Sequence, residues 1–102
     1  MTDHKPALNN FDKAFESRIR LQIMIVLAAN EIYDFNSLKD LLHVTSGNLA
    51  FHLKHLEKGK YIVVTKSFLG RKSNTRYKAS IKGINAFKKH LAVLENLIIG
   101  EK

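Results

Sequence analysis

The chain has 102 residues, a length that suits a single domain, and its 45% hydrophobic and 25% charged content argues against disorder. Seventeen Lys and Arg against nine Asp and Glu give a net charge of +8, while the absence of cysteine excludes disulfides, thiolate metal sites and thiol redox chemistry. The first ten residues lack the apolar core of a signal peptide, and the longest apolar run, residues 23–29, is too short to cross a bilayer. We therefore expect a cytoplasmic protein without membrane contact.

The basic residues are unevenly distributed along the chain. Between Glu57 and Glu95 there is no acidic residue, and the same window holds ten basic ones. A field of one sign on part of a small domain attracts a polyanion, because each neutralised phosphate releases condensed counterions. The pattern indicates a nucleic-acid partner, and a basic surface that only keeps the protein soluble is the alternative.

The N-terminal third predicts an irregular arm over residues 1–10 and then a helix over residues 10–29, capped by Asn10 or Asp12. One apolar stripe at i, i+4 spacing runs along this helix: Phe11, Phe15, Ile19, Ile23 and Val26. A short connection over residues 30–35 follows. Within it, Tyr33 and Phe35 supply either a stub of strand or a core contact.

Two further helices joined by a tight turn come next. The first begins near Asn36 or Ser37 and ends near Leu42, and we expect three inward side chains on it: Leu38, Leu41 and Leu42. After a turn over residues 43–46, Thr45 or Ser46 caps a third helix that ends near Gly59. Its buried face carries Leu49, Leu53 and Leu56.

The last third changes from helical to extended spacing and back. Residues 61–68 are rich in β-branched and aromatic types and predict a strand, residues 69–74 a polar turn, and residues 75–79 the returning strand. Ser80 caps a final helix with one apolar stripe: Ile81, Ile84, Phe87, Leu91, Leu94 and Leu97 or Ile98. The element order α-α-α-β-β-α predicts a mainly α chain with a small β-hairpin (α+β), a winged helix-turn-helix.

The motifs carry a resemblance to a known family. The segment over residues 46–62 resembles the recognition helix and strand entry of MarR/ArsR-like winged-helix regulators: SGNLAFHLKHLE at 46–57 and GKYI at 59–62. Residues 68–77 and 80–87 are similar to the wing and last helix of a compact single-domain subgroup. Lys60 departs from the pattern, since an apolar residue or glycine would be less surprising there. The resemblance covers residues 11–98 and implies a homodimeric repressor or activator on a near-palindromic operator.

The third helix predicts a reading surface for the major groove. If its leucines face inward, the opposite side presents a set of candidate DNA contacts: Ser46, Gly47, Asn48, Phe51, Lys54, His55 and Lys58. Asn48 can bond an adenine edge, Lys54 or His55 can bond guanine or phosphate, and Phe51 can contact a thymine methyl. Ser46 lies where free helix amides favour a phosphate, and Gly47 lets the backbone approach the groove. The alternative for Phe51 is that it folds back against the second helix or the wing.

The hairpin supplies the remaining DNA contacts that we predict. Arg71 and Lys72 stand at the tip, where Arg can enter the narrow minor groove of an A·T tract; a solvated polar turn is the alternative. Arg76 and Lys78 share one strand face and are expected to line the phosphate backbone, while the intervening side chains point into the core.

The apolar stripe of the last helix is longer than a small core requires, which predicts a homodimer. The expected dimer contacts come from the first and last helices: Phe11, Phe15, Phe87, Leu91, Leu94 and Ile98. The domain plan is then an arm at 1–10, a winged helix-turn-helix at 11–80 and a dimerisation helix at 81–102 that packs on the same domain. The alternative is that the last helix only packs on its own domain and does not pair with a second subunit.

Enzymatic and metal chemistry find no support in the sequence. No Ser-His-Asp arrangement, paired carboxylates or glycine-rich phosphate loop is present, and His52 and His55 lack further ligands at metal spacing. We expect no enzyme activity, no cofactor and no metal, and the chain does not identify a small-molecule effector. The leading hypothesis is sequence-specific binding of double-stranded DNA that regulates transcription. A winged-helix protein-interaction module and nonspecific coating of nucleic acid are the rivals.

Overall fold

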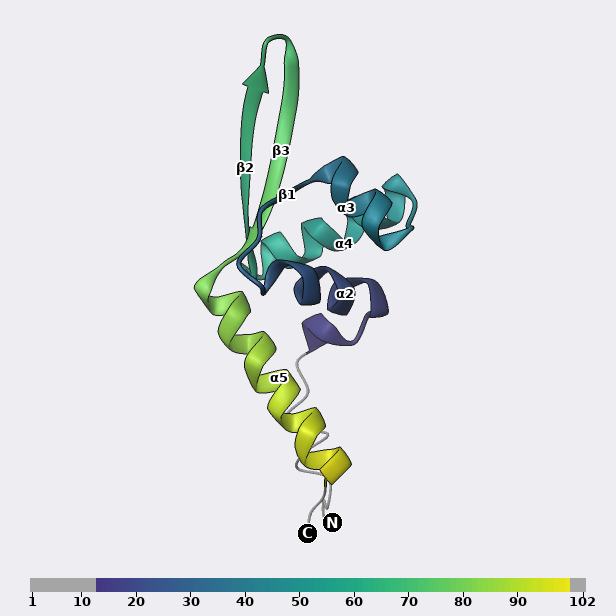
Figure 1. The fold of residues 1–102 in the computed structure, drawn as a ribbon, viewed down its shortest axis with the longest axis vertical. Coiled ribbons are helices and arrows are strands. Elements are labelled where there is room, and N and C mark those ends of the chain that lie inside the picture. Colours follow the sequence, from purple (N-terminus) through teal and green to yellow (C-terminus); the bar gives the residue numbers. More distant parts are fainter. Residues whose placement is uncertain (1–12, 100–102) are drawn as a thin grey trace.

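The computed structural model describes residues 13–99, which form four α-helices, one 3-10 helix and a three-stranded antiparallel sheet (Figure 1). The elements follow one another as η1 (Lys13–Phe15), α2 (Arg18–Leu27), β1 (Tyr33–Asp34), α3 (Phe35–Leu42), α4 (Ser46–Lys58), β2 (Ile62–Leu69), β3 (Lys72–Ala79) and α5 (Ile81–Ile99). This order confirms the predicted winged helix-turn-helix class, a mainly α chain with a small hairpin.

The first predicted helix is interrupted. Within the described residues a 3-10 turn ends at Phe15, and α2 begins only at Arg18 because Ser17 forms its N-cap. The Ser17 hydroxyl oxygen accepts a hydrogen bond from the Arg20 backbone N–H at 3.3 Å, satisfying one of the donors that a helix start leaves open. The prediction of one continuous helix over residues 10–29 is therefore wrong at residues 16 and 17. The proposed caps Asn10 and Asp12 lie outside the described residues.

Helices α3 and α4 form the helix-turn-helix pair. His43 ends α3 in a left-handed conformation with φ 55°, and Thr45 caps α4 by accepting the Asn48 backbone N–H on its hydroxyl oxygen at 3.1 Å. The predicted cap at Thr45 and the predicted end at Gly59 are confirmed. Leu41 was expected to face inward and is 50% exposed, because the core covers only a narrow strip of this two-turn helix.

The sheet has the strand order β1-β3-β2, so the predicted stub of strand at Tyr33 exists and pairs with Tyr77. Strands β2 and β3 pair from Ile62 opposite Ala79 to Leu69 opposite Lys72. The predicted polar turn over residues 69–74 is too long, since Gly70 with φ 67° allows a two-residue turn and residues 72–74 continue the strand. The wing is consequently longer than the sequence indicated and extends well beyond α3 and α4 (Figure 1).

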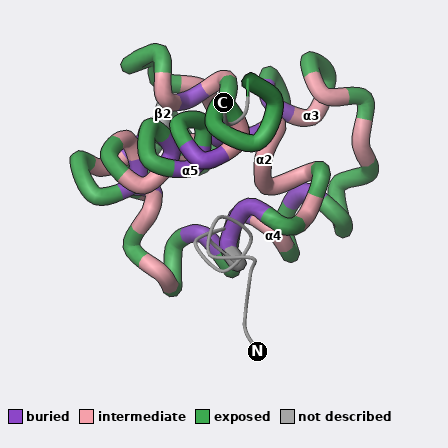
Figure 2. Tube along the Cα trace, turned by 90° about the horizontal axis from the view of Figure 1, so that it is seen from below, coloured by how far each residue is buried: buried purple, intermediate pink, exposed green. Residues whose placement is uncertain are grey.

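The core lies between the helices and one face of the sheet. It contains the predicted leucines of α4 together with side chains from every other major element: Ile23, Met24, Leu27, Leu38, Leu49, Leu53, Leu56, Ile62, Ala79 and Phe87. Figure 2, which views the molecule from the end opposite the wing, shows buried stretches along α4 and α5 and exposed positions around the periphery. Burying one face of α4 in this way fixes which of its side chains face solvent.

Helix α5 docks on the core at its first turns. As predicted, Ser80 caps it, and the Ser80 hydroxyl oxygen accepts the Gly83 backbone N–H at 2.9 Å. The predicted apolar stripe is only partly buried: Ile81 and Ile98 are each 80% exposed and Leu91 is 46% exposed. The buried positions are Phe87, which belongs to the predicted stripe, and Gly83, His90 and Val93, which do not, because α5 packs along a line rotated from the most apolar one.

Candidate nucleic-acid interface

The outer face of α4 presents all seven residues that the sequence predicts there. These residues are exposed and lie together on one helix: Ser46, Gly47, Asn48, Phe51, Lys54, His55 and Lys58. Phe51 is 64% exposed and its ring meets only the edge of the neighbouring His52 ring, with centroids 5.1 Å apart, so it does not fold back onto α3 or the wing. Phe51, Lys54, His55 and Lys58 surround a shallow hollow of about 260 Å³.

The first turn of α4 is open to a close approach. A Cβ atom built on Gly47 would meet no atom within 4 Å, and both Ser46 and Asn48 are exposed. Thr45 satisfies the Asn48 backbone N–H, while the positive end of the helix dipole points outward. An anion such as a phosphate can therefore reach this helix end without displacing a side chain.

Hydrogen bonds of Arg20 on α2 link η1 to α4. Arg20 on α2 donates from Nε to the carbonyl oxygen of Ala14 at 2.7 Å, and its Nη1 lies 3.0 Å from Nδ1 of His52 on α4. The guanidinium can only donate, so His52 accepts on an unprotonated nitrogen. Burial, followed by the nearby charges of Arg20 and His55, lowers the pKa of His52. His52 therefore serves as a helix anchor, which sequence spacing alone did not reveal.

A groove of about 270 Å³ separates α4 from the wing. Lys54 and Glu57 line it from the helix, and Val64, Lys66 and Tyr77 line it from the strands. Burial raises the pKa of the Tyr77 hydroxyl, and the Glu57 carboxylate acts in the same direction. Lys66 was not among the predicted site residues, although its spacing from Ile62 and Val64 places it on the same strand face.

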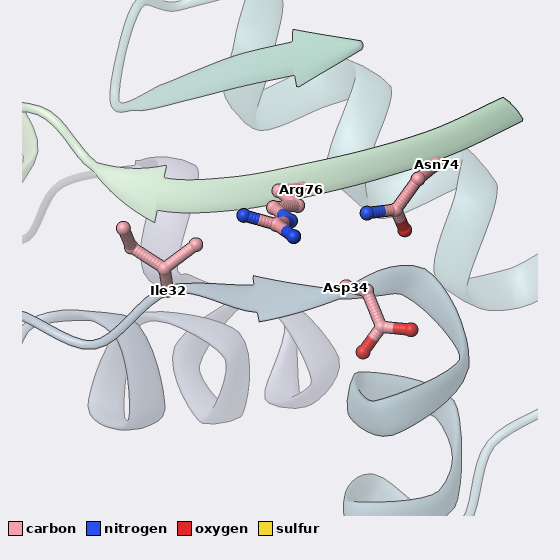
Figure 3. Close-up of a pocket in the computed structure, with 4 residues that line it drawn as sticks. All are labelled: Ile32, Asp34, Asn74 and Arg76. Atoms are coloured by element: carbon pink, nitrogen blue, oxygen red, sulfur yellow. The ribbon is translucent and has the colours of Figure 1, made fainter. Parts of the chain in front are cut away.

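The two basic pairs of the wing lie in different places. Arg71 and Lys72 are exposed at the tip, as predicted. Arg76 and Lys78 are also exposed, but they lie on the sheet face that points away from α4, because strand side chains alternate and their neighbour Tyr77 lines the groove. Figure 3 shows Arg76 and Asn74 on β3 facing Asp34 of β1 and Ile32, which directly precedes β1. These four residues line a hollow of about 440 Å³.

The comparisons with known proteins agree with this geometry. The family model described as winged helix DNA-binding domain matches residues 19–98, most of the chain. The chain belongs to this family. It is 38% identical over 79 residues to an uncharacterised protein of Methanocaldococcus jannaschii, an alignment that covers 78% of this chain and 86% of that protein.

Solved structures of other winged helix proteins show the same fold. The transcriptional regulator homologue protein from Pyrococcus horikoshii OT3 superposes with a TM-score of 0.85 and 27% identity over 93% of this chain and 96% of that one. ZitR of Lactococcus lactis, a zinc-responsive MarR family member, superposes with a TM-score of 0.62 and 19% identity over 81% of this chain and 56% of that chain. The winged-helix part of the resemblance seen in the sequence is thereby confirmed, whereas the finer assignment to MarR/ArsR-like regulators stays a prediction.

The winged helix domain leaves an apolar surface where α2 and α5 meet. A hollow of about 320 Å³ there is lined by residues of both helices: Ile25, Ala28, Ala29, Ile84, Phe87, Lys88 and Leu91. Of the predicted dimer contacts, Leu91 and Ile98 are exposed and Leu94 is half-buried. Phe15 and Phe87 are buried in the core of their own chain, where their rings lie 6.0 Å apart, and Phe11 lies outside the described residues.

Residues 13–99 hold neither a cluster of metal ligands nor a helix able to span a membrane. In that part of the chain, no three His, Cys, Asp or Glu side chains come together in a way that would hold a metal ion. Each described helix is too short or too polar to cross a membrane.

Proposed function

We propose that this winged helix protein regulates transcription by binding duplex DNA with sequence preference as a homodimer. The observation that carries the proposal is the outer face of α4, which is exposed along its whole length and flanked by a cationic hairpin. A helix of this width fits the major groove, and the field of the wing attracts phosphates. The relationship to the Pyrococcus horikoshii regulator homologue supports a role in transcription.

The residues of α4 divide into base-reading and phosphate-binding roles. Asn48 bonds an adenine edge, Phe51 contacts a thymine methyl, and Lys54 or His55 bonds a guanine edge or a phosphate. At the open first turn, the backbone around Ser46 and Gly47 approaches a phosphate. Lys58, at the far end of the helix, contacts the backbone.

The wing provides the second set of contacts. Arg71 at the tip enters an adjacent minor groove, and Lys72 binds the flanking phosphates. Lys66 joins them from the groove beside α4. We assign Arg76 and Lys78 to the long-range positive field rather than to direct contact with the backbone, because their side chains lie on the other face of the sheet.

Dimerisation sets the spacing of the two reading helices. The apolar hollow between α2 and α5, with the exposed Leu91, half-buried Leu94 and exposed Ile98 on α5, suits a second copy of the same surface. A two-fold axis there would place the two α4 helices about 34 Å apart, one turn of B-DNA, on a near-palindromic operator.

Selection of bound duplexes from a random pool, followed by binding measurements at two salt concentrations, tests the proposal. We expect one enriched and nearly palindromic sequence, with log K falling against log salt by about 0.9 for each phosphate contacted. Binding without any enriched sequence would indicate nonspecific coating. Failure to bind any duplex would leave the protein-interaction module, with Phe51 at its centre, as the better explanation.

A further inference from the structure

The most exposed aromatic side chain of the described residues is on the wing rather than on α4. Phe68 is 73% exposed, compared with 64% for Phe51. Phe68 lies near the end of β2, two residues before Gly70 at the turn, and its partner on β3 is Ser73. Phe68 makes no contribution to the buried core.

The face on which Phe68 lies is the one that borders the recognition helix. Side chains alternate along a strand, so Phe68 shares a face with Val64 and Lys66, and both of these line the groove beside α4. Phe68 is six residues beyond the buried Ile62, which corresponds to about 20 Å at about 3.3 Å per residue. Strand β2 therefore carries Phe68 well away from the core, toward the tip of the wing.

The surroundings of Phe68 fit a polyanion better than a protein. Its neighbours on the same face are Lys66, Ser73 and Thr75, and Arg71 follows at the tip. An aromatic hot spot at a protein interface normally sits among other apolar residues that exclude water, and these neighbours are polar. Duplex DNA presents the matching arrangement, with charge on the outside and apolar base faces stacked inside.

We propose that Phe68 is an apolar wedge that enters the minor groove beside the wing tip and partly separates two stacked base pairs. The inference rests on the proposed function and adds a second way of reading sequence. Apolar wedges of this kind kink the duplex toward the major groove by roughly 20–90°. The kink is easiest at flexible pyrimidine–purine steps, so the wing discriminates by deformability while α4 reads base edges.

Energy transfer between dyes on the two ends of a 30-base-pair duplex tests the wedge. One probe contains several TpA steps, and the second has the same base composition arranged without them. We expect the wild-type protein to raise the transfer on binding, and more strongly with the first probe. Phe68→Ala should bind that probe about tenfold more weakly and leave the transfer near that of the free duplex.

Two matched variants separate the wedge from other effects. Ser67→Ala changes the neighbouring exposed residue on the opposite strand face and should bind and bend as the wild type does. Phe68→Leu keeps an apolar wedge and should retain part of the bend. Because no phosphate contact is lost, Phe68→Ala should keep the wild-type dependence of binding on salt, whereas Lys72→Ala, which removes a phosphate contact, should reduce that slope by about 0.9.

The outcomes distinguish this inference from the proposed function. If Phe68→Ala binds and bends DNA as the wild type does, the wedge is wrong and binding through α4 stands. Weaker binding with an unchanged bend would assign Phe68 to a surface contact and also overturn the wedge. If the wild-type protein binds neither probe nor any selected duplex, both the proposed function and the wedge fall. Thermal melting of Phe68→Ala at the wild-type temperature would verify that the variant folds.

Discussion

Arg20 connects three segments of the molecule through a single side chain. Its guanidinium donates to the carbonyl oxygen of Ala14 and lies within hydrogen-bond distance of His52 on the recognition helix. The second contact needs an unprotonated Nδ1 on His52, since two donors repel each other. The orientation of α4 is thereby coupled to the protonation of one imidazole.

This coupling predicts that acid weakens the fold through His52. The pKa of His52 is lowered from 6.5 in the folded protein, chiefly by burial, so the unfolded chain binds the proton more readily. The stabilising contribution is complete above pH 6.5 and is lost as the pH falls through the folded pKa. His52→Gln, whose amide oxygen can accept from Arg20, should remove this part of the pH dependence.

Urea unfolding between pH 5 and pH 7.5 measures the effect. As the pH falls, the unfolding free energy of the wild type should decrease more than that of His52→Gln. The two proteins differ only at position 52, so the comparison isolates the contribution of that side chain. Parallel curves for the two proteins would show that His52 is not the responsible group.

Single residues illustrate what the sequence could and could not predict. The Thr45 cap and the inward leucines of α4 follow from local chemistry and periodicity, and both are confirmed. Lys60 stood out in the sequence as a departure, and its φ of 65° gives the reason, because glycine adopts that conformation without strain. Phe68 was missed since an aromatic in a strand pattern is typical of a core position, and only the length of the wing places it in solvent.

At the scale of elements, the attachment of α5 to the sheet depends on one close approach. Gly83 lies directly against the carbonyl of Tyr61, which also accepts the Ser80 backbone N–H at 3.0 Å. A Cβ atom at position 83 would overlap that carbonyl, and backbone atoms cannot move aside as a flexible side chain can. The start of α5 therefore tolerates only glycine in its present position.

Gly83→Ala should lower the free energy of unfolding by about 1–3 kcal/mol, the usual cost of overpacking. The matched control is Gly47→Ala, since nothing lies within 4 Å of a Cβ there and alanine is the better helix former. Urea unfolding of the two variants beside the wild type checks the difference. Equal stability of Gly83→Ala and the wild type would mean that α5 is not held by this contact.

The elements also show where sequence patterns stop being informative. Residues 72–74 are polar and predict a turn, but they continue β3, because the outer wing is largely exposed and needs no apolar side chain to pair. The most apolar line of α5 is not its buried line. Phe87 lies on both, but packing on α2 and Phe15 buries Gly83 and His90 and leaves Leu91 and Ile98 exposed. Periodicity located these elements, while tertiary contacts decided their ends and rotation.

At the scale of the whole molecule, the exposed apolar surface of α5 is the basis for the dimer. We expect the wild type to be dimeric at micromolar concentration and Leu91→Asp to be monomeric, because a charge buried in an apolar interface is strongly unfavourable. Loss of the second half-site contact should also weaken binding to a palindromic duplex. The control is Leu41→Asp, a comparably exposed leucine on α3.

Analytical ultracentrifugation distinguishes these states. A monomeric wild type, or a Leu91→Asp variant that remains dimeric, would contradict the proposed interface. The family and the fold followed from the ordered set of elements in the sequence. The partner surface did not, because a single chain's periodicity does not distinguish a helix side that meets its own core from one that meets a second copy.

Asn48→Ala tests whether α4 reads bases in the major groove. Equilibrium binding should be measured on the selected duplex and on a scrambled duplex of the same composition. We expect Asn48→Ala to lose about 1–3 kcal/mol of binding free energy on the selected duplex and little on the scrambled one. Lys58→Ala should weaken binding to both duplexes alike. Equal losses for Asn48→Ala on the two duplexes would contradict base reading by α4.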